Sequence, residues 1–322
     1  MSSPISSQPP QQAPAAPTHP APQAPAAQPQ APQWQGGVPA PTTYTSPIPI
    51  RSTHLGHALA SEWTKIRSVR STMWTLGVMF LLVIGIGLMT AVGLASSEYT
   101  QVPLLSGGLF GLMLGQICIV TLGVLVITSE YGTGMIRTTM TACPARGRVL
   151  AAKAVVFFGL SFTMTLIATT LTALIQSAML GGRPAGEFSS LPQESIVNGE
   201  VIATNSEWLA ATVGAALYVA LLGLLALAVG AMLRHSAGAI TTMLGVILLP
   251  LLLALFMQME SLRDLQEFLV EYSPLNGLAT LYQLPFMGEE GSGNGWGLLG
   301  GLAVVTVAAL AGAFALTHKR DV

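Results

Sequence analysis

The sequence predicts an all-α integral membrane protein. Of its 322 residues, 51% are hydrophobic and only 8% are charged, whereas a soluble domain has about 25% charged residues. The mean hydropathy is +0.62. Six separate apolar runs are each long enough to cross the ~30 Å hydrocarbon core of a bilayer as a helix. A soluble fold could not bury this much apolar surface.

The six runs share two properties: each exceeds the minimum length of a spanning helix, and none contains Asp, Glu, Lys or Arg. A buried soluble core does not account for six such runs in one chain. We therefore predict six transmembrane helices, with both ends of the chain on the same side of the membrane. The predicted spans are residues 74–94, 104–127, 154–180, 208–233, 239–257 and 296–316.

Residues 1–50 contain no Lys, Arg, Asp or Glu and are rich in Pro, Ala and Gln. This composition cannot bury enough apolar area to offset the entropy of ordering. We expect a disordered cytoplasmic tail, followed by one membrane domain over residues 51–322. The tail is either a plain solvated segment or a ligand for a proline-recognising partner.

Basic residues set the orientation, because they are retained on the cytoplasmic side. Only Arg183 and Arg263 fall on one side of the predicted spans. The other lysines and arginines all fall on the opposite side: Arg51, Lys65, Arg67, Arg70, Arg137, Arg146, Arg148, Lys153, Arg234, Lys319 and Arg320. Both termini are therefore predicted to be cytoplasmic.

Residues 55–70 form a predicted amphipathic, basic helix. Apolar residues recur every three or four positions, with Lys65 and Arg67 between them. Such a helix is suited to the membrane surface, with Trp63 at the depth of the lipid headgroups. The alternative is a cytosolic extension of the first span.

The loop over residues 129–153 is the most informative segment. Thr133 is expected to cap a helix of about two turns that Pro144 interrupts or ends. This short cytoplasmic helix would be joined rigidly to the second and third spans, and so could receive a push from a cytosolic partner. The alternative is a basic connector that only fixes topology.

The same loop carries a resemblance to a known family. The run Thr128-Ser129-Glu130-Tyr131-Gly132-Thr133, followed by Pro144-Ala145-Arg146 and Lys153, resembles the coupling region of type-2 ABC exporter permeases. The segment Glu62-Trp63-Thr64-Lys65 is similar to the N-terminal connecting helix of actinobacterial members, and Tyr272-Ser273-Pro274-Leu275 follows an amphipathic stretch as in the family. Together the resemblance covers residues 55–320.

The resemblance implies a permease subunit of a bacterial plasma-membrane exporter, paired as a homodimer or heterodimer. It also implies that a cytosolic ATPase contacts the loop, through Glu130, Tyr131, Gly132, Thr133, Arg137 and Arg146. The chain itself has no Gly-x-x-x-x-Gly-Lys-Ser/Thr motif, so ATP would be bound by that separate subunit. We expect no enzymatic activity, cofactor, metal site or nucleic-acid partner in this chain. The alternative function is a six-span scaffold or signalling protein that transports nothing.

Two further patterns concern packing. Gly107, Gly111 and Gly115 lie on one face of the second span and permit close helix approach, either between two subunits or within one. Between the fifth and sixth spans, Leu262, Leu265, Phe268, Leu269 and Tyr272 form an apolar stripe opposite charged residues. We expect a helix at the outer interface there, acting as an exit gate or as a plain cap.

Overall fold

A computed structural model of the protein describes residues 54–319, except 143–145, 187–190, 192, 258 and 287–294. The predicted disordered tail lies outside the described residues. So does Pro144, the predicted end of the short cytoplasmic helix.

The six predicted spans are confirmed as six long apolar helices. Each helix extends past its apolar run at one end or both, by up to eight residues at the start of α5. Two ends are shorter than predicted: α3 begins at Gly108 rather than at residue 104, and α8 ends at Phe256 rather than at residue 257. One π-helical turn, Ala210–Gly214, joins two segments of the fourth span. The helices are α2 (Arg70–Ala95), α3 (Gly108–Gly132), α5 (Arg146–Leu180), α6 with α7 (Asn205–Leu209 and Ala215–Leu233), α8 (Ser236–Phe256) and α11 (Trp296–Lys319).

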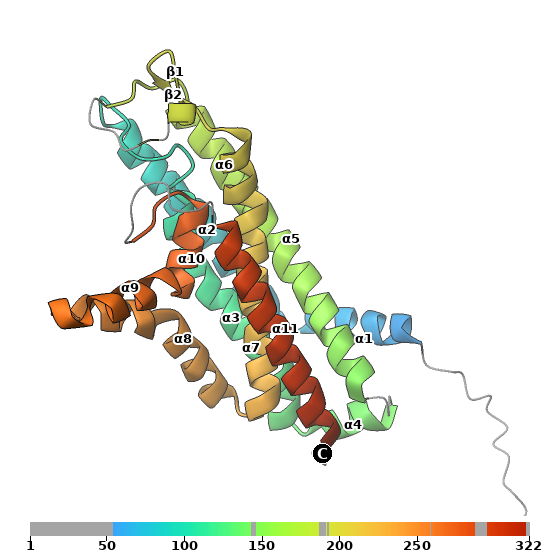
Figure 1. The fold of residues 1–322 in the computed structure, drawn as a ribbon. Helices are drawn as coiled ribbons and strands as arrows, with labels where there is room; N and C mark the ends of the chain where they lie inside the picture. Colours follow the sequence, from blue (N-terminus) through green and yellow to red (C-terminus); the bar gives the residue numbers. More distant parts are fainter. Residues whose placement is uncertain are drawn as a thin grey trace, which may run out of the picture. The chain divides into compact units, whose positions relative to one another are not determined.

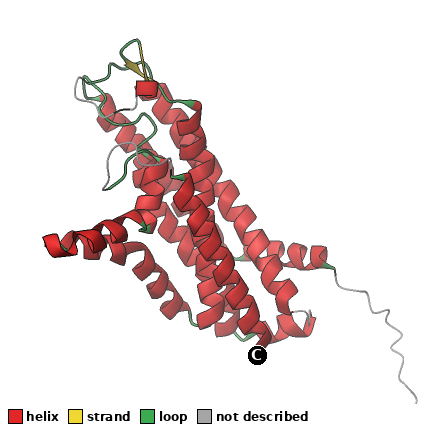
Figure 2. Ribbon diagram, in the orientation of Figure 1, coloured by secondary structure: helices red, strands yellow, loops and turns green. Residues whose placement is uncertain are grey.

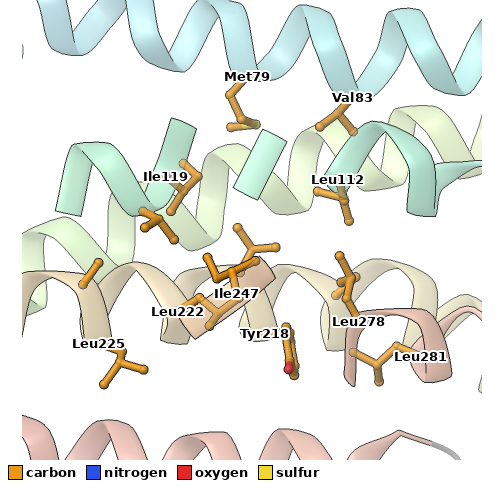
Figure 3. Close-up of a cluster of buried hydrophobic side chains, with 14 of the residues drawn as sticks. Met79, Val83, Leu112, Ile119, Tyr218, Leu222, Leu225, Ile247, Leu278 and Leu281 are labelled. Carbon is orange, nitrogen blue, oxygen red and sulfur yellow. The ribbon is translucent and has the colours of Figure 1, made fainter. Parts of the chain in front are cut away.

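The helix α7 lies at the centre of the bundle and packs against α3, α5 and α11. It is the most buried of the six spans, whereas α11 is the least buried. Figure 3 shows the core between α2, α3 and α7, where Met79, Ile119 and Leu222 are almost completely buried. The outer faces of the bundle are apolar and exposed, as expected for helices surrounded by lipid.

Glycine allows α3 and α7 to cross closely. A Cβ atom on Gly123 would collide with the carbonyl oxygen of Gly223, and one on Gly223 would lie 2.8 Å from the side chain of Ile119. Small residues at such a crossing let two backbones approach and make extensive van der Waals contact. The two glycines therefore set the separation of α3 and α7.

The two ends of the bundle differ in structure (Figures 1 and 2). One end, here called the α4 end, carries the short helix α4 (Met135–Ala142) and the end of α11. The other, here called the hairpin end, carries the antiparallel strands β1 (Ile196–Val197) and β2 (Glu200–Val201) after a 3-10 turn at Gln193–Ser195. The hairpin was not predicted from the sequence, because strands of two residues leave no hydrophobic periodicity.

At the hairpin end, Arg183 holds the C-terminus of α2. Its guanidinium donates hydrogen bonds to the carbonyl oxygens of Leu94 (3.2 Å), Ala95 (2.5 Å) and Ser97 (2.6 Å). The last carbonyls of a helix lack intrahelical partners and carry partial negative charge. Arg183 satisfies three carbonyls at this helix end.

Three more helices and one 3-10 turn lie outside the six spans. The helix α1 (Leu55–Ser68) is separated from α2 by an extended residue, Val69, and runs across the bundle rather than along it. The 3-10 turn Glu260–Leu262 leads into α9 (Arg263–Glu271), which confirms the predicted amphipathic helix, and α10 (Pro274–Leu281) follows. Figure 1 shows α9 projecting sideways from the bundle. A continuous extension of the first span, the alternative for residues 55–70, does not match the break at Val69.

Candidate functional site at the α4 end

Four charged side chains from three helices meet at the α4 end. Glu62 and Lys65 come from α1, Glu130 from the last turns of α3, and Lys153 from the beginning of α5. The Lys153 ammonium lies 2.7 Å from Glu62 Oε2 and 2.8 Å from Glu130 Oε1. The Lys65 ammonium lies 2.8 Å from Glu62 Oε1 and 3.0 Å from Glu130 Oε1. We call these four residues the ionic cluster.

The ionic cluster is largely shielded from solvent. The side chains of Glu62, Glu130 and Lys153 are each less than 10% exposed, and that of Lys65 is 30% exposed. Buried charges are tolerated when opposite charges and hydrogen bonds compensate for the loss of water. Two carboxylates and two ammonium groups balance here, so the cluster fastens α1 to α3 and α5.

Burial by itself would lower the pKa of Lys65, but hydrogen bonds and attraction from Glu62 and Glu130 outweigh burial and raise the pKa above its ordinary value of 10.5. Lys65 therefore contributes stability that is fully present below pH 10.5 and is lost as the pH rises through the higher folded-state pKa. We expect the thermal unfolding midpoints of the wild type and of Lys65→Met to differ at neutral pH and to converge above pH 10.5. A pH titration of both midpoints in detergent tests this, and convergence near neutral pH would contradict it.

Glu130, predicted to contact a partner, faces the interior instead. Its Oε1 atom binds both lysines, while its Oε2 atom is buried without a hydrogen-bond partner among the described residues. Its side chain is only 7% exposed, and its contact with a partner stays a prediction. If Glu130 takes part in coupling, its role is to hold α3 against α1 and α5.

The next three predicted residues, Tyr131, Gly132 and Thr133, have three different environments. The ring of Tyr131 lies under the guanidinium of Arg234, with 5.1 Å from the Arg234 Cζ atom to the ring centroid. Gly132 is exposed with open space beside it. The prediction that Thr133 caps α4 is wrong, because its hydroxyl donates 2.8 Å to the Ser129 carbonyl of α3. The chain then turns at Gly134, whose φ of +73° favours glycine.

The helix α4 has one face toward the bundle and one toward solvent. Ile136 is buried, whereas Met135, Arg137 and Thr138 are exposed. The Thr139 hydroxyl lies 3.5 Å from the Lys65 ammonium, at the edge of the ionic cluster. Of the two predicted arginines, Arg137 is therefore accessible to a partner. Arg146 begins α5, and its side chain lies outside the described atoms.

On α1, the three predicted interfacial residues divide between two faces. Trp63 is 49% exposed and Arg67 is exposed. Lys65 turns toward Glu62 and Glu130 in the ionic cluster and is 30% exposed. The attraction of two carboxylates explains its inward position.

The glycine stripe of α3 faces α2 of the same chain. A Cβ atom on Gly111 would lie 2.7 Å from the Val83 carbonyl oxygen, and one on Gly115 would lie 2.8 Å from the Val83 side chain. A Cβ on Gly107 would collide with Thr90 and Gln176. The structure thus uses all three glycines for packing within one subunit.

Sequence reasoning did not select Glu62 and Lys153 as site residues. Lys153 directly precedes the third predicted span and Glu62 lies in the predicted amphipathic helix. The two are 91 residues apart, and no local pattern reveals contacts at that distance. The available signal was positional: all four cluster residues lie on the predicted cytoplasmic side, with Glu130 and Lys153 within three residues of a predicted span.

These features define the class of protein. The chain is a multi-pass helical membrane protein, with six spans and a buried ionic cluster at one end. Comparison with protein-family models found no match, and comparison with curated proteins found none either.

Proposed function

We propose that this chain is the membrane-spanning permease subunit of an ATP-driven ABC exporter and couples to a separate ATP-binding subunit. The observation that carries the proposal is the arrangement at the α4 end. There, a two-turn helix exposes Met135, Arg137 and Thr138 and is joined at both ends to spanning helices. The resemblance of residues 128–153 to the coupling region of type-2 exporters supports the same function.

The ionic cluster supports a mechanical role for this end. A push on α4 is transmitted to α3 and α5, between which α4 is connected. Because Lys153 and Lys65 tie α1 to the same two helices, the three helices would move together. Closure of two ATPase subunits would then tilt the spans between inward-facing and outward-facing states.

A groove between α1 and α4 offers a place for the ATPase. Its volume is about 330 Å³, and it is lined by residues of α1, α4 and the beginning of α5. Its wall includes both apolar and charged side chains: His57, Ala58, Ser61, Lys65, Met135, Thr138, Thr139 and Val149. A partner that inserts here would contact α4 and the ionic cluster at once.

The basic residues favour an orientation with the α4 end in the cytoplasm of a bacterial cell. In that orientation the hairpin end and α9 lie outside. Two copies of the chain, or this chain and a related permease, would enclose one transport path. Export is favoured because type-2 permeases, which the chain resembles, are exporters.

The test is co-purification of the tagged protein from detergent-solubilised membranes of its host, with mass spectrometry of bound proteins. We expect recovery of a soluble ATPase that carries the phosphate-binding motif this chain lacks. Arg137→Glu on α4 should reduce that recovery about tenfold, because a reversed charge at a contact opposes binding by 1.4 kcal/mol or more. The matched control, Arg263→Glu on α9, should leave recovery unchanged.

Two results would contradict the proposal. Intact protein without any ATPase, in detergent mild enough to preserve other complexes, would favour the six-span scaffold. Equal loss of the ATPase with both variants would show that α4 is not the contact.

A further inference from the structure

An apolar groove lies where α8 meets α9 and α10. Its volume is about 520 Å³, within the range of roughly 300–1,000 Å³ that is typical of small-molecule sites. All of its described lining residues are apolar: Leu248, Leu251, Leu252, Ala254, Leu255, Val270, Leu275 and Phe286. The groove is separate from the ionic cluster and from the groove between α1 and α4.

Hydrogen bonds fix the segments around this groove relative to one another. Gln266 Nε2 on α9 donates 2.9 Å to the Ala254 carbonyl near the end of α8. Asn276, which is 2% exposed, donates from Nδ2 to the Glu271 carbonyl and accepts the backbone N–H of Phe286 at 3.0 Å. The groove is therefore defined by specific contacts of the fold and is not a gap left by loose packing between helices.

The position of α9 places the groove at the edge of the hydrocarbon. On α9, Leu265, Phe268 and Tyr272 are exposed, and their apolar stripe is not covered by the described part of the chain. The charged pair Arg263 and Glu267, 2.8 Å apart, lies on the same helix and is exposed to solvent. A helix with these two faces lies in the membrane interface with its apolar face toward the acyl chains. The groove at the junction of α8 and α9 then opens into the hydrocarbon just below the headgroups.

We propose that this groove binds one acyl chain of a membrane phospholipid as a defined site. The described lining offers no side-chain donor or acceptor, so water would find few partners there, and a polar ligand would lose its hydrogen bonds. An empty groove would leave its leucines without contacts on one side. A flexible apolar chain can fill such a groove, and the acyl chains of the bilayer lie at the opening of the groove. This inference requires only that α8 spans a membrane, and it does not depend on the proposed transport function.

The experiment uses the full-length protein in vesicles of phosphatidylethanolamine and phosphatidylglycerol that contain a small fraction of phosphatidylglycerol with a diazirine in one acyl chain. The protein is extracted into detergent with an excess of unlabelled phospholipid, irradiated after a delay and mapped by mass spectrometry. We expect label on both walls of the groove, at Leu252 and Phe286, to survive the exchange. Label on the open face of α11, at Val304 and Val307, should disappear because lipid there exchanges freely.

Two leucines of α8 supply a matched pair of variants. Leu252 and Leu253 are both 50% exposed, but only Leu252 lines the groove. Leu252→Trp should fill the groove and reduce retained label at Phe286 about tenfold, as a mismatched pocket does. Leu253→Trp should not reduce it. If Leu252→Trp does not fold, Leu248→Trp from the same wall replaces it.

Three outcomes would overturn the proposal. Equal loss of label from the groove and from α11 would show ordinary surface lipid only. Equal effects of Leu252→Trp and Leu253→Trp would show that filling the groove is irrelevant. Label on α11 without any in the groove, before exchange, would show that a second copy of the chain or another protein covers it.

Discussion

Replacing Lys153 by methionine is expected to destabilise the protein by about 3–5 kcal/mol, the loss typical when one partner of a buried ion pair is removed. Lys153 is 3% exposed at its side chain and bonds both Glu62 and Glu130. Without it, two carboxylates remain close together in a buried site, where Lys65 is the remaining cation that pairs with both among the described residues. The helix α1 should then detach from α5.

The measurement is the free energy of unfolding in mixed micelles, by titration with a denaturing detergent. Lys319→Met, at the exposed end of α11, removes the same charge at a side chain that forms no ion pair with the described residues, and it should change stability by less than about 0.5 kcal/mol. Adding Glu130→Gln to Lys153→Met should restore part of the loss, since one uncompensated charge is removed. Equal effects of Lys153→Met and Lys319→Met would contradict the buried cluster.

Gly123→Ala is expected to destabilise the bundle by about 1–3 kcal/mol, because overpacking at a close crossing forces backbones apart. The added Cβ atom meets the Gly223 carbonyl oxygen and lies 3.2 Å from the ring of Phe157. A backbone carbonyl cannot rotate away as a side chain can. The helices α3 and α7 must therefore separate along their whole contact.

The control for this variant is Gly159→Ala on α5, where the added Cβ atom meets nothing within 4 Å. There, alanine should be neutral or stabilising by up to about 1 kcal/mol, since it favours helix more than glycine does. Both variants are compared by thermal unfolding in the same detergent. If Gly123→Ala is no less stable than Gly159→Ala, the crossing is looser than the structure indicates.

The spans could be predicted from the sequence because each depends on its own residues. An apolar run of sufficient length forms a helix in a bilayer whatever its neighbours are, since every backbone group must bond internally. For the same reason the amphipathic stripe of α9 was recognisable from residues 262–272 alone. The two-turn helix α4 was predicted from Thr133 as its cap and Pro144 as its end. The helix is present at Met135–Ala142, although the predicted cap was wrong and Pro144 lies outside the described residues.

The candidate site could not be predicted in the same way. Whether Lys65 points to lipid or to Glu130 depends on how α1 crosses α5, and that crossing leaves no local pattern. The Thr133 prediction failed for a related reason: its hydroxyl has two acceptable partners, and the carbonyl of Ser129, one turn earlier in α3, is already in place. The glycine stripe was recognisable, but its partner helix was fixed only by the tertiary fold.

The wide sequence separation within the ionic cluster has a consequence for the order of events during synthesis. Chains are made from the N-terminus, and their segments fold in that order as they emerge. Glu62 is made 91 residues before Lys153. The Glu62 carboxylate of α1 therefore lacks the Lys153 ammonium while the first two spans enter the membrane. The helix α1 can contact Glu130 of α3 earlier through Lys65, but it completes its ionic contacts only when the third span begins to insert. A ribosome-stalled chain that ends before Lys153 should therefore leave α1 accessible to protease, and a chain that includes α5 should protect it.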